Sequence, residues 1–222
     1  MNEKEHSSVA SQPHSENATP EPTPLPRLKA EFVDLRDEDV VTIREQIGSE
    51  SYEIVVSEDA SMKPPDVENQ INNARLRNFR DRYEVELLAL LRTCEFEYGF
   101  DSLADTFVET RMRENSFVTM YWISLLFIEH LKDPAVAIGI LRVLAHLKYE
   151  QAYPLGLSIA IAATRHQNHE VQECGIRAFE NWGTADSLKV LERLTFSEPW
   201  IQEYVNQVVG DLYSQIVTSH AG

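Results

Sequence analysis

The stretch EVQECGIRAFENWG, Glu170–Gly183, decides the fold that we predict for this chain. Its apolar residues recur at the spacing i, i+3, i+4, i+7 and i+8, which marks one face of an α-helix. A similar pattern returns thirty positions later in WIQEYVNQVVGDL, Trp200–Leu212. The two apolar stripes consist of Val171, Cys174, Gly175, Ala178 and Phe179, and of Ile201, Tyr204, Val205, Val208 and Val209. Two matching helices raise the question of a repeated unit.

The same pattern occurs in two earlier stretches, GFDSLADTFVETRM and PAVAIGILRVLAHL. Their stripes consist of Phe100, Leu103, Ala104, Phe107 and Val108, and of Val136, Gly139, Ile140, Val143 and Leu144. The equivalent positions Phe100, Val136, Val171 and Ile201 are separated by 36, 35 and 30 residues. Further helix-length stretches lie between them, so the sequence predicts about eight helices from Glu84 on, joined by short loops. This period is typical of an α-solenoid, and an irregular helical bundle is the alternative.

Proline and glycine mark the ends of the predicted helices. Asp133-Pro134 and Glu198-Pro199 place proline in a first helical turn, where its missing N–H is tolerated. Gly183 follows the opening helix, as a C-terminal cap does. Gly139 and Gly210 fall inside helices, where glycine costs about 1 kcal/mol relative to alanine. They indicate either close helix packing or poor repeats.

NHEVQECGIRAFENWG resembles the second helix of a HEAT-type repeat, in which a polar turn leads into V-x-x-x-x-x-x-A followed by an apolar residue. DPAVAIGILRVLAHL is similar. The resemblance covers roughly residues 84–216, is strongest at 169–182 and is weak before Asp133. Its period is closer to that of short HEAT-like repeats than to that of long HEAT units. The resemblance implies an all-α, HEAT-like helical-hairpin solenoid, which we place at residues 66–217, and a function in binding.

Residues 1–65 are predicted to form a disordered or weakly ordered acidic arm. Residues 1–30 are polar and rich in proline, which favours an extended chain. EFVDL and YEIVVSEDAS contain short β-prone cores, and DEDVVTIREQIG is compatible with a brief helix. YEIVVSEDAS also resembles motifs that add a strand to a partner's sheet, as SUMO-interacting motifs do. We expect order there to be weak or to depend on a partner.

The charge of the chain bears on its partners. The net charge is −16, of which −10 lies before residue 71. An acidic surface repels phosphate, so nucleic-acid binding is disfavoured and a basic protein partner is favoured. Cys94 and Cys174 lie far apart in helical patterns and are interpreted as buried hydrophobes of a reducing compartment. No apolar stretch is long enough to span a membrane and no secretory signal is visible, so we expect a cytoplasmic protein.

No catalytic or metal-binding pattern stands out in the sequence. The glycine-rich phosphate loops, the G-x-S-x-G nucleophile motif and C-x-x-C pairs are absent. His166 and His169 are three residues apart, but they fall at a predicted turn without cysteine ligands, so we interpret them as solvated or capping residues. We therefore expect no enzyme activity, no cofactor and no metal.

The second helices of a solenoid line one continuous face, which is usually the binding face. Six residues after the first member of each apolar stripe come Thr106, Arg142, Arg177 and Gln207. Because these positions lie off the apolar stripe, they are predicted to face outward. The candidate contacts on this face are Arg142, Arg177, Glu173, Gln202 and Glu203. The alternative is that these groups bond between repeats or are simply solvated.

A cluster of basic residues stands out in NARLRNFRDRY. It consists of Arg75, Arg77, Arg80 and Arg82. The cluster is a second candidate contact, for the acidic segment Glu31–Asp59 of the same chain, for an acidic partner or for phosphate. The alternative is a solvated first helix that caps the solenoid.

The sequence favours a non-enzymatic scaffold or adaptor that binds a protein through its second helices. One alternative is an acidic inhibitor or immunity-type protein that blocks a basic site on a partner enzyme. A second alternative is a HEAT-like enzyme acting on nucleic acid, such as an alkylpurine DNA glycosylase, which would use the arginine cluster as an anchor and Trp122, Trp182 and Trp200 around a groove.

Overall fold

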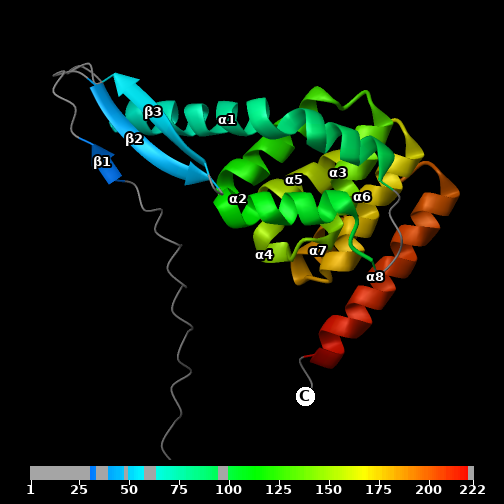
Figure 1. The fold of residues 1–222 in the computed structure, drawn as a ribbon. Helices are drawn as coiled ribbons and strands as arrows, with labels where there is room; N and C mark the ends of the chain where they lie inside the picture. Colours follow the sequence, from blue (N-terminus) through cyan, green and yellow to red (C-terminus); the bar gives the residue numbers. More distant parts are fainter. Residues whose placement is uncertain (1–30, 34–39, 48–49, 58–63, 95–99, 220–222) are drawn as a thin grey trace, which may run out of the picture.

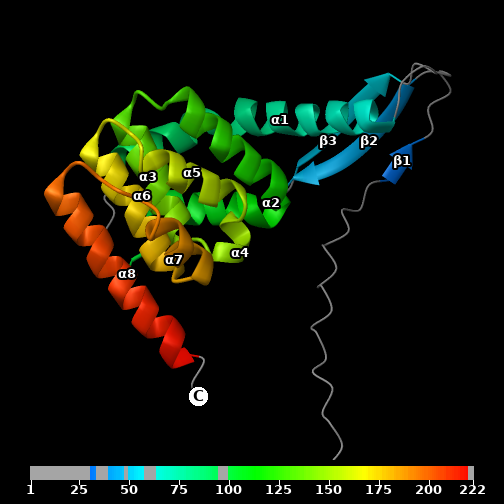
Figure 2. The same cartoon turned by 180° about the vertical axis from the view of Figure 1, so that it is seen from behind.

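The computed structural model describes residues 31–33, 40–47, 50–57, 64–94 and 100–219 (Figure 1). Residues 1–30, for which we predicted disorder, lie outside the described residues. The helices are gathered into one bundle, and a small sheet lies beside the first part of the first helix. The sheet and the last helix are at opposite ends of the molecule in both views (Figures 1 and 2).

The described residues from position 64 on form a chain of helices. They are α1 Pro64–Thr93, α2 Leu103–Glu129, α3 Pro134–His146, α4 Tyr149–Ala152, α5 Leu155–Ala163, α6 His169–Trp182, α7 Ala185–Leu191 and α8 Pro199–Ser219. The predicted helical domain at 66–217 agrees with these bounds to within two residues at either end. The all-α fold class is therefore confirmed for this part of the chain.

Local sequence signals explain where the later helices begin and end. Pro134 is the first residue of α3, and the side chain of Asp133 accepts a hydrogen bond from the Val136 N–H. Asn168 caps α6 in the same way. Gly183 ends α6 in the left-handed conformation, with φ of 61°, which favours glycine. The predicted helix boundaries at Pro134 and Gly183 are confirmed.

A break at Asn115 divides α2 into two segments. Asn115 has non-helical dihedral angles, φ −157° and ψ 98°, and its Oδ1 accepts a hydrogen bond from the Val118 N–H at 3.0 Å. Asn115 thus acts as an N-cap in the middle of the element, since asparagine is among the preferred capping residues. The sequence predicted separate helices on either side of this residue, and the break agrees with that prediction.

The register of the first predicted unit is wrong by five residues. Val136, Val171 and Ile201 are each the third residue of their helix and are fully buried. The third residue of α2 is Asp105, whereas Phe100 lies before the helix and is 70% exposed. Phe100 and Leu103 were assigned to the apolar stripe because periodicity alone does not say where a helix begins. The capping box of Ser102 and Asp105 fixes that start.

The helices α3, α5, α7 and α8 all pack against α6, while α2 contacts both α3 and α5. Helix α1 packs on α2 and α3 and adds Phe79, Leu87 and Leu91 to the core. The largest fully buried side chain is that of Trp122 in α2, which meets Phe79 edge to face. The core is thus continuous from α1 to α8.

Residues that we predicted to be weakly ordered form an antiparallel sheet. Its strands are β1 Glu31–Val33, β2 Val40–Ile47 and β3 Glu50–Ser57, in the order β1-β2-β3. The helix considered for DEDVVTIREQIG is wrong, because its β-branched residues pair with β3 over the whole of β2. The predicted all-α class does not include this sheet. Strand β3 also lies against α1.

Candidate partner-binding site

Three of the predicted contact residues, Arg142, Glu173 and Arg177, meet where α3 packs against α6. Arg142 of α3 and Glu170, Glu173, Cys174 and Arg177 of α6 line a small hollow of about 100 Å³. Four of the lining side chains are charged, and the fifth, Cys174, is buried. The prediction that Arg142, Glu173 and Arg177 share one face is consistent with this geometry. Sequence reasoning missed Glu170, since nothing local indicates its position opposite α3.

The charges of the hollow are arranged in two opposite pairs. Arg142 Nη2 lies 3.7 Å from Glu170 Oε1, which joins α3 to α6. Arg177 Nη2 lies 2.6 Å from Glu173 Oε1, one helical turn earlier on α6. About half of the Arg177 side chain and more than a third of that of Arg142 remain exposed. Both guanidinium groups are therefore positioned but accessible, and exposed pairs of this kind add only about 0–1 kcal/mol to stability.

The same surface continues onto α8 through Tyr204. Its hydroxyl donates a hydrogen bond to Glu180 Oε2 of α6. Burial, together with this hydrogen bond, raises the pKa of Tyr204 well above that of a free tyrosine. Glu203 is exposed beside it. The surface thus runs over α3, α6 and α8, and its polar groups come from all three helices.

Gln202 has a different role from the one that we predicted. Its Oε1 accepts from the Phe196 N–H at 2.9 Å, and its Nε2 donates to Asn206 Oδ1 at 2.9 Å. Gln172 makes a bond of the opposite direction at the equivalent place on α6, where its Nε2 donates to the His166 carbonyl at 2.6 Å. Each glutamine reaches back six residues to the loop before its own helix. Gln202 is therefore a half-buried loop anchor rather than an outward contact.

The predicted arginine cluster on α1 does not form a single patch. Arg80 is bound to Glu84 and, at 2.7 Å, to Glu129 of α2, and these hydrogen bonds raise its pKa. Arg75 donates to Asn72 at 3.3 Å. Burial raises the pKa of Glu114 on α2, and the nearby charges of Arg111 and Arg82 lower it in part. Arg77 is exposed. Arg80 thus joins α1 to α2 rather than forming an open basic surface.

The corrected register of α2 identifies another arginine. Arg111 stands six residues after Asp105, as Arg142 and Arg177 stand six residues after Val136 and Val171. Its guanidinium is 4.1 Å from the ring centroid of Tyr83 on α1 and makes an ion pair of 2.9 Å with Glu114. Arg111 is therefore turned toward α1, and the outward arginine pair consists of Arg142 and Arg177.

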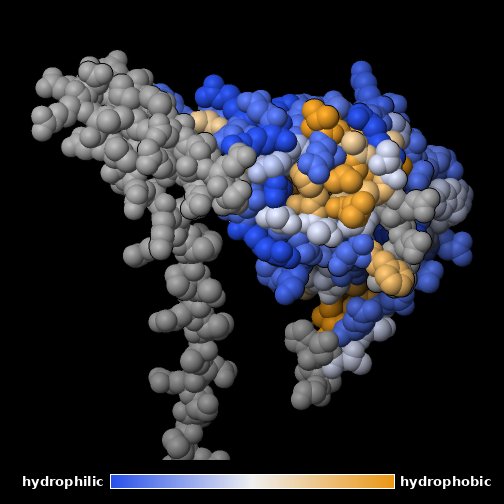
Figure 3. Space-filling view, viewed as in Figure 1, coloured by the Kyte–Doolittle hydropathy of each residue, from blue (hydrophilic) through white to orange (hydrophobic). Residues whose placement is uncertain are grey.

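A partly apolar surface lies between α1 and α2, and the sequence interpretation assigned two of its residues, Leu103 and Phe107, to the core. Its hollow of about 320 Å³ is lined by Glu86, Leu90, Leu103, Thr106, Phe107, Thr110 and Arg111. Figure 3 shows apolar side chains gathered on the face where α1 and α2 lie in Figure 1. Leu103 is 71% exposed there, because the helix begins later than periodicity indicated.

The other residues considered for chemistry are used by the fold. His166 Nδ1 accepts from the Asn168 N–H at 2.9 Å, so Nε2 carries the proton of the neutral ring and faces the Leu131 carbonyl at 2.7 Å. Both of its nitrogens thus hold loops in place. Of the three tryptophans, Trp122 and Trp182 are buried and Trp200 is about half exposed, so only Trp200 has an accessible ring face.

Comparisons with models of known protein families, with curated proteins and with solved structures gave no match. Among the helices that the structure describes, none has the length and apolar character required to cross a membrane.

The thiol of Cys174, which lines the hollow, gives a test of how α6 packs. Burial raises the pKa of Cys174, and the guanidinium of Arg142 lowers it in part. At neutral pH this leaves less reactive thiolate than an ordinary cysteine has, and the side chain is only 6% exposed. Each cysteine is measured alone, Cys174 in the Cys94→Ser variant and Cys94 in the Cys174→Ser variant. In the native protein we expect a thiol reagent to modify Cys174 more slowly than Cys94.

The rate of modification is measured, with and without urea, from the absorbance of the coloured group that the thiol reagent releases. Unfolding should bring the two rates together, because it removes the burial that distinguishes them. Equal rates in the native state would contradict the packing described for α6.

Proposed function

We propose that this chain is a non-enzymatic interaction scaffold or adaptor, built from HEAT-like helix pairs, that binds a protein through α3, α6 and α8. The observation that carries the proposal is the meeting of Arg142, Glu173 and Arg177 at one hollow between two successive second helices. A surface of half-exposed, positioned charges on a continuous face suits recognition of a folded protein or a peptide.

The repeat interpretation draws support from side chains that do the same work in successive units. Gln172 and Gln202 both bond to the backbone six residues earlier, and Val171 and Ile201 are both buried at the third helical position. Helices α5 and α6 pack together, as do α7 and α8, while α6 contacts both α3 and α8. An alternation of pair contacts and second-helix contacts is typical of a solenoid.

The support is confined to the later part of the chain. In a parallel stack of second helices, the start of α2 would lie against the start of α3. Instead Asp105, the third residue of α2, lies against His146 at the end of α3. Arg111 likewise faces α1. The proposed repeats therefore comprise α3 and the helices after it, with α1 and the first segment of α2 as a cover on one end.

Charge favours a protein over a nucleic acid as the partner. The hollow itself contains two arginines and two glutamates, so it has no excess of positive charge to neutralise phosphates. The whole chain has a net charge of −16, which favours encounter with basic surfaces. The partner that we propose is a protein with a basic surface that places one or more carboxylates near Arg142 and Arg177.

Charge reversal of the outward arginines tests this assignment. We expect the double variant Arg142→Glu, Arg177→Glu to bind its partner at least about tenfold more weakly, since both replaced charges would repel the partner's carboxylates. The partner is first captured by crosslinking from the source cells with the wild-type chain, and its dissociation constant is then measured with purified proteins.

A matched control is available elsewhere on the surface. Arg113 makes an exposed ion pair with Glu109 one turn away, and Lys189 makes one with Asp186. The double variant Arg113→Glu, Lys189→Glu changes the net charge equally but should leave the affinity within about twofold. If the two double variants weakened binding equally, the effect would belong to net charge and the proposed face would be wrong. Tight, salt-sensitive capture of a single basic enzyme would favour the inhibitor alternative over a scaffold.

A further inference from the structure

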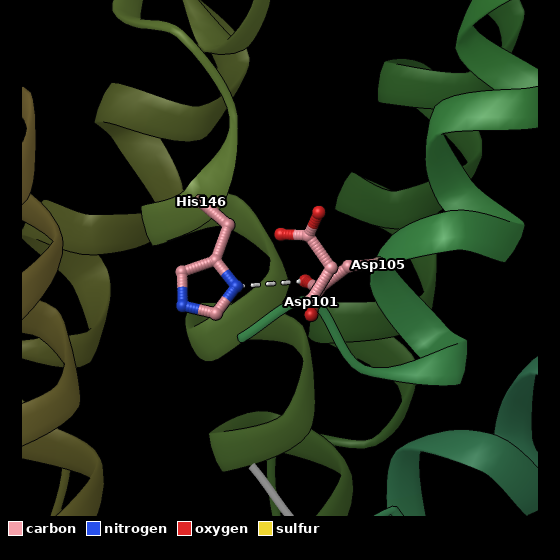
Figure 4. A group of neighbouring side chains, drawn as sticks. All are labelled: Asp101, Asp105 and His146. Carbon is pink, nitrogen blue, oxygen red and sulfur yellow. Dashed lines mark ion pairs between the residues drawn. The ribbon is translucent and has the colours of Figure 1, made fainter. Parts of the chain in front are cut away.

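Two carboxylates and an imidazole come together where α2 begins and α3 ends. Asp101 lies just before α2, Asp105 is in its first turn, and His146 is the last residue of α3. One ligand-type atom from each of the three side chains lies within 4.8 Å of the others. Figure 4 shows the ring of His146 facing the two aspartates across the gap between the helices. His146 thus forms one cluster with Asp105, 41 positions earlier in the chain, and with Asp101, 45 positions earlier.

Asp105 occupies a position at which the three helices α3, α6 and α8 carry a buried aliphatic side chain. The third residue is Val136 in α3, Val171 in α6 and Ile201 in α8, and each is fully buried. Asp105 is buried to the same degree, with 2% of its surface exposed. Burying a carboxylate is unfavourable unless it is paired or bound to a metal. The position therefore calls for a partner on each oxygen.

Only one of the two oxygens has a hydrogen-bond partner. Asp105 Oδ2 accepts from the Ser102 N–H at 2.6 Å, which completes the capping box. Asp105 Oδ1 is buried and accepts no hydrogen bond, although His146 Nδ1 lies 3.1 Å away. The contact is an ion pair only if the imidazole is protonated. Helix capping thus accounts for Oδ2, while Oδ1 faces His146 Nδ1 across the cluster and has no hydrogen bond of its own.

We propose that Asp101, Asp105 and His146 bind a divalent transition-metal ion of the zinc type. Zinc lies about 2.0–2.2 Å from carboxylate oxygen and imidazole nitrogen, so two ligands are about 3.0 Å apart at a right angle and about 3.4 Å apart at the tetrahedral angle. The separation of 3.1 Å between Asp105 Oδ1 and His146 Nδ1 lies in this range. Asp101 is exposed, so its side chain is able to turn toward the ion.

The ligand types favour zinc, manganese or cobalt over magnesium and calcium. Imidazole suits the first-row transition metals, whereas calcium takes six to eight oxygen ligands and magnesium retains several waters. Zinc usually takes four ligands, so three protein ligands leave one coordination position open. Water is able to reach this position because Asp101 and part of the His146 side chain are exposed. Bound metal would join the start of α2 to the end of α3.

Metal binding is tested on the full chain with Zn²⁺ and Co²⁺, with Mg²⁺ for comparison. We expect titration calorimetry to show that one Zn²⁺ binds per chain and that Mg²⁺ binds at least about tenfold more weakly. Bound Co²⁺ should give an absorption band in the visible range, at a position that indicates coordination by nitrogen. Asp101→Asn and His146→Gln should each weaken Zn²⁺ binding by about tenfold or more and remove the rise in Tm that the metal produces.

A second histidine–carboxylate pair provides the control. His169 Nε2 lies 3.9 Å from Glu198 Oε1 on the surface, and both side chains are more than 40% exposed. His169→Gln should bind Zn²⁺ as the wild type does. Asp105→Asn also disturbs the helix cap, so its Zn²⁺ binding is interpreted only if its circular dichroism spectrum is native. Asp101 is exposed and is no part of the cap, so Asp101→Asn decides whether the cluster binds metal. The proposal would be overturned if Asp101→Asn bound Zn²⁺ as tightly as the wild type does. It would also be overturned if His169→Gln lost as much Zn²⁺ affinity as His146→Gln. In either case Asp105 and His146 would form a His–Asp contact without a metal. The test measures the metal alone and is independent of any protein partner.

Discussion

Replacing Trp122 by alanine is expected to lower the free energy of unfolding by about 3–5 kcal/mol, the usual range for a buried aromatic side chain. The indole is completely buried between α1 and α2 and meets Phe79 edge to face, with ring centroids 6.1 Å apart. Its Nε1–H also donates to Glu84 Oε2 at 3.2 Å. Trp122 is the largest fully buried side chain among the described residues, so its truncation leaves a cavity that the surrounding helices are expected to fill only in part.

The measurement is urea unfolding followed by circular dichroism. Trp200→Ala is the matched control, because that indole is 47% exposed at the start of α8 and should cost about 1 kcal/mol or less. Trp122→Phe separates the two contributions, since it keeps most of the ring and removes the bond to Glu84. Similar losses for Trp122→Ala and Trp200→Ala would contradict the packing of α1 on α2.

Replacing Gly139 by alanine is expected to destabilise the protein by about 1–3 kcal/mol, although alanine is the better helix former. A Cβ at this position would lie 2.6 Å from the Leu91 carbonyl oxygen and 3.0 Å from Leu91 Cβ. The neighbour is backbone of α1, which is unable to turn away as a flexible side chain does. The two helices would have to separate.

Gly210 supplies the opposite case. It also lies inside a helix, but a Cβ there has nothing within 4 Å. Gly210→Ala should therefore stabilise the protein by up to about 1 kcal/mol, the ordinary helix-propensity difference. Chemical unfolding of the two variants side by side checks both signs. A gain in stability for Gly139→Ala would mean that α1 and α3 are not in close contact.

The glycines show what periodicity is able to predict. The sequence indicated that both lie inside helices and offered close packing or poor repeats as the reason. Close packing applies to Gly139 and not to Gly210. The local signal is the same at both positions, because the difference lies in an α1 carbonyl that is 48 residues earlier in the chain.

The candidate site was predicted in part for a related reason. Arg142, Glu173 and Arg177 were found because they lie off an apolar stripe, and that property is encoded within one helix. Glu170 as the partner of Arg142, and the cluster of Asp101, Asp105 and His146, depend on which helices are neighbours. The serine and aspartate of the capping box were a local signal that was available at Ser102 and Asp105 and would have corrected the first register.

The sequence by itself determined the existence of α3, α5, α6, α7 and α8, the starts at Pro134 and Pro199, the glycine that ends α6 and the outward direction of Arg142 and Arg177. These properties follow from hydrogen bonds and side-chain periods within a few residues of each position. Only the tertiary structure decided that Asp105 is buried against His146, that Arg80 joins α1 to α2 and that residues 40–57 pair as strands. Each of these depends on a contact between segments distant in the chain, for which a single helix or strand carries no local pattern.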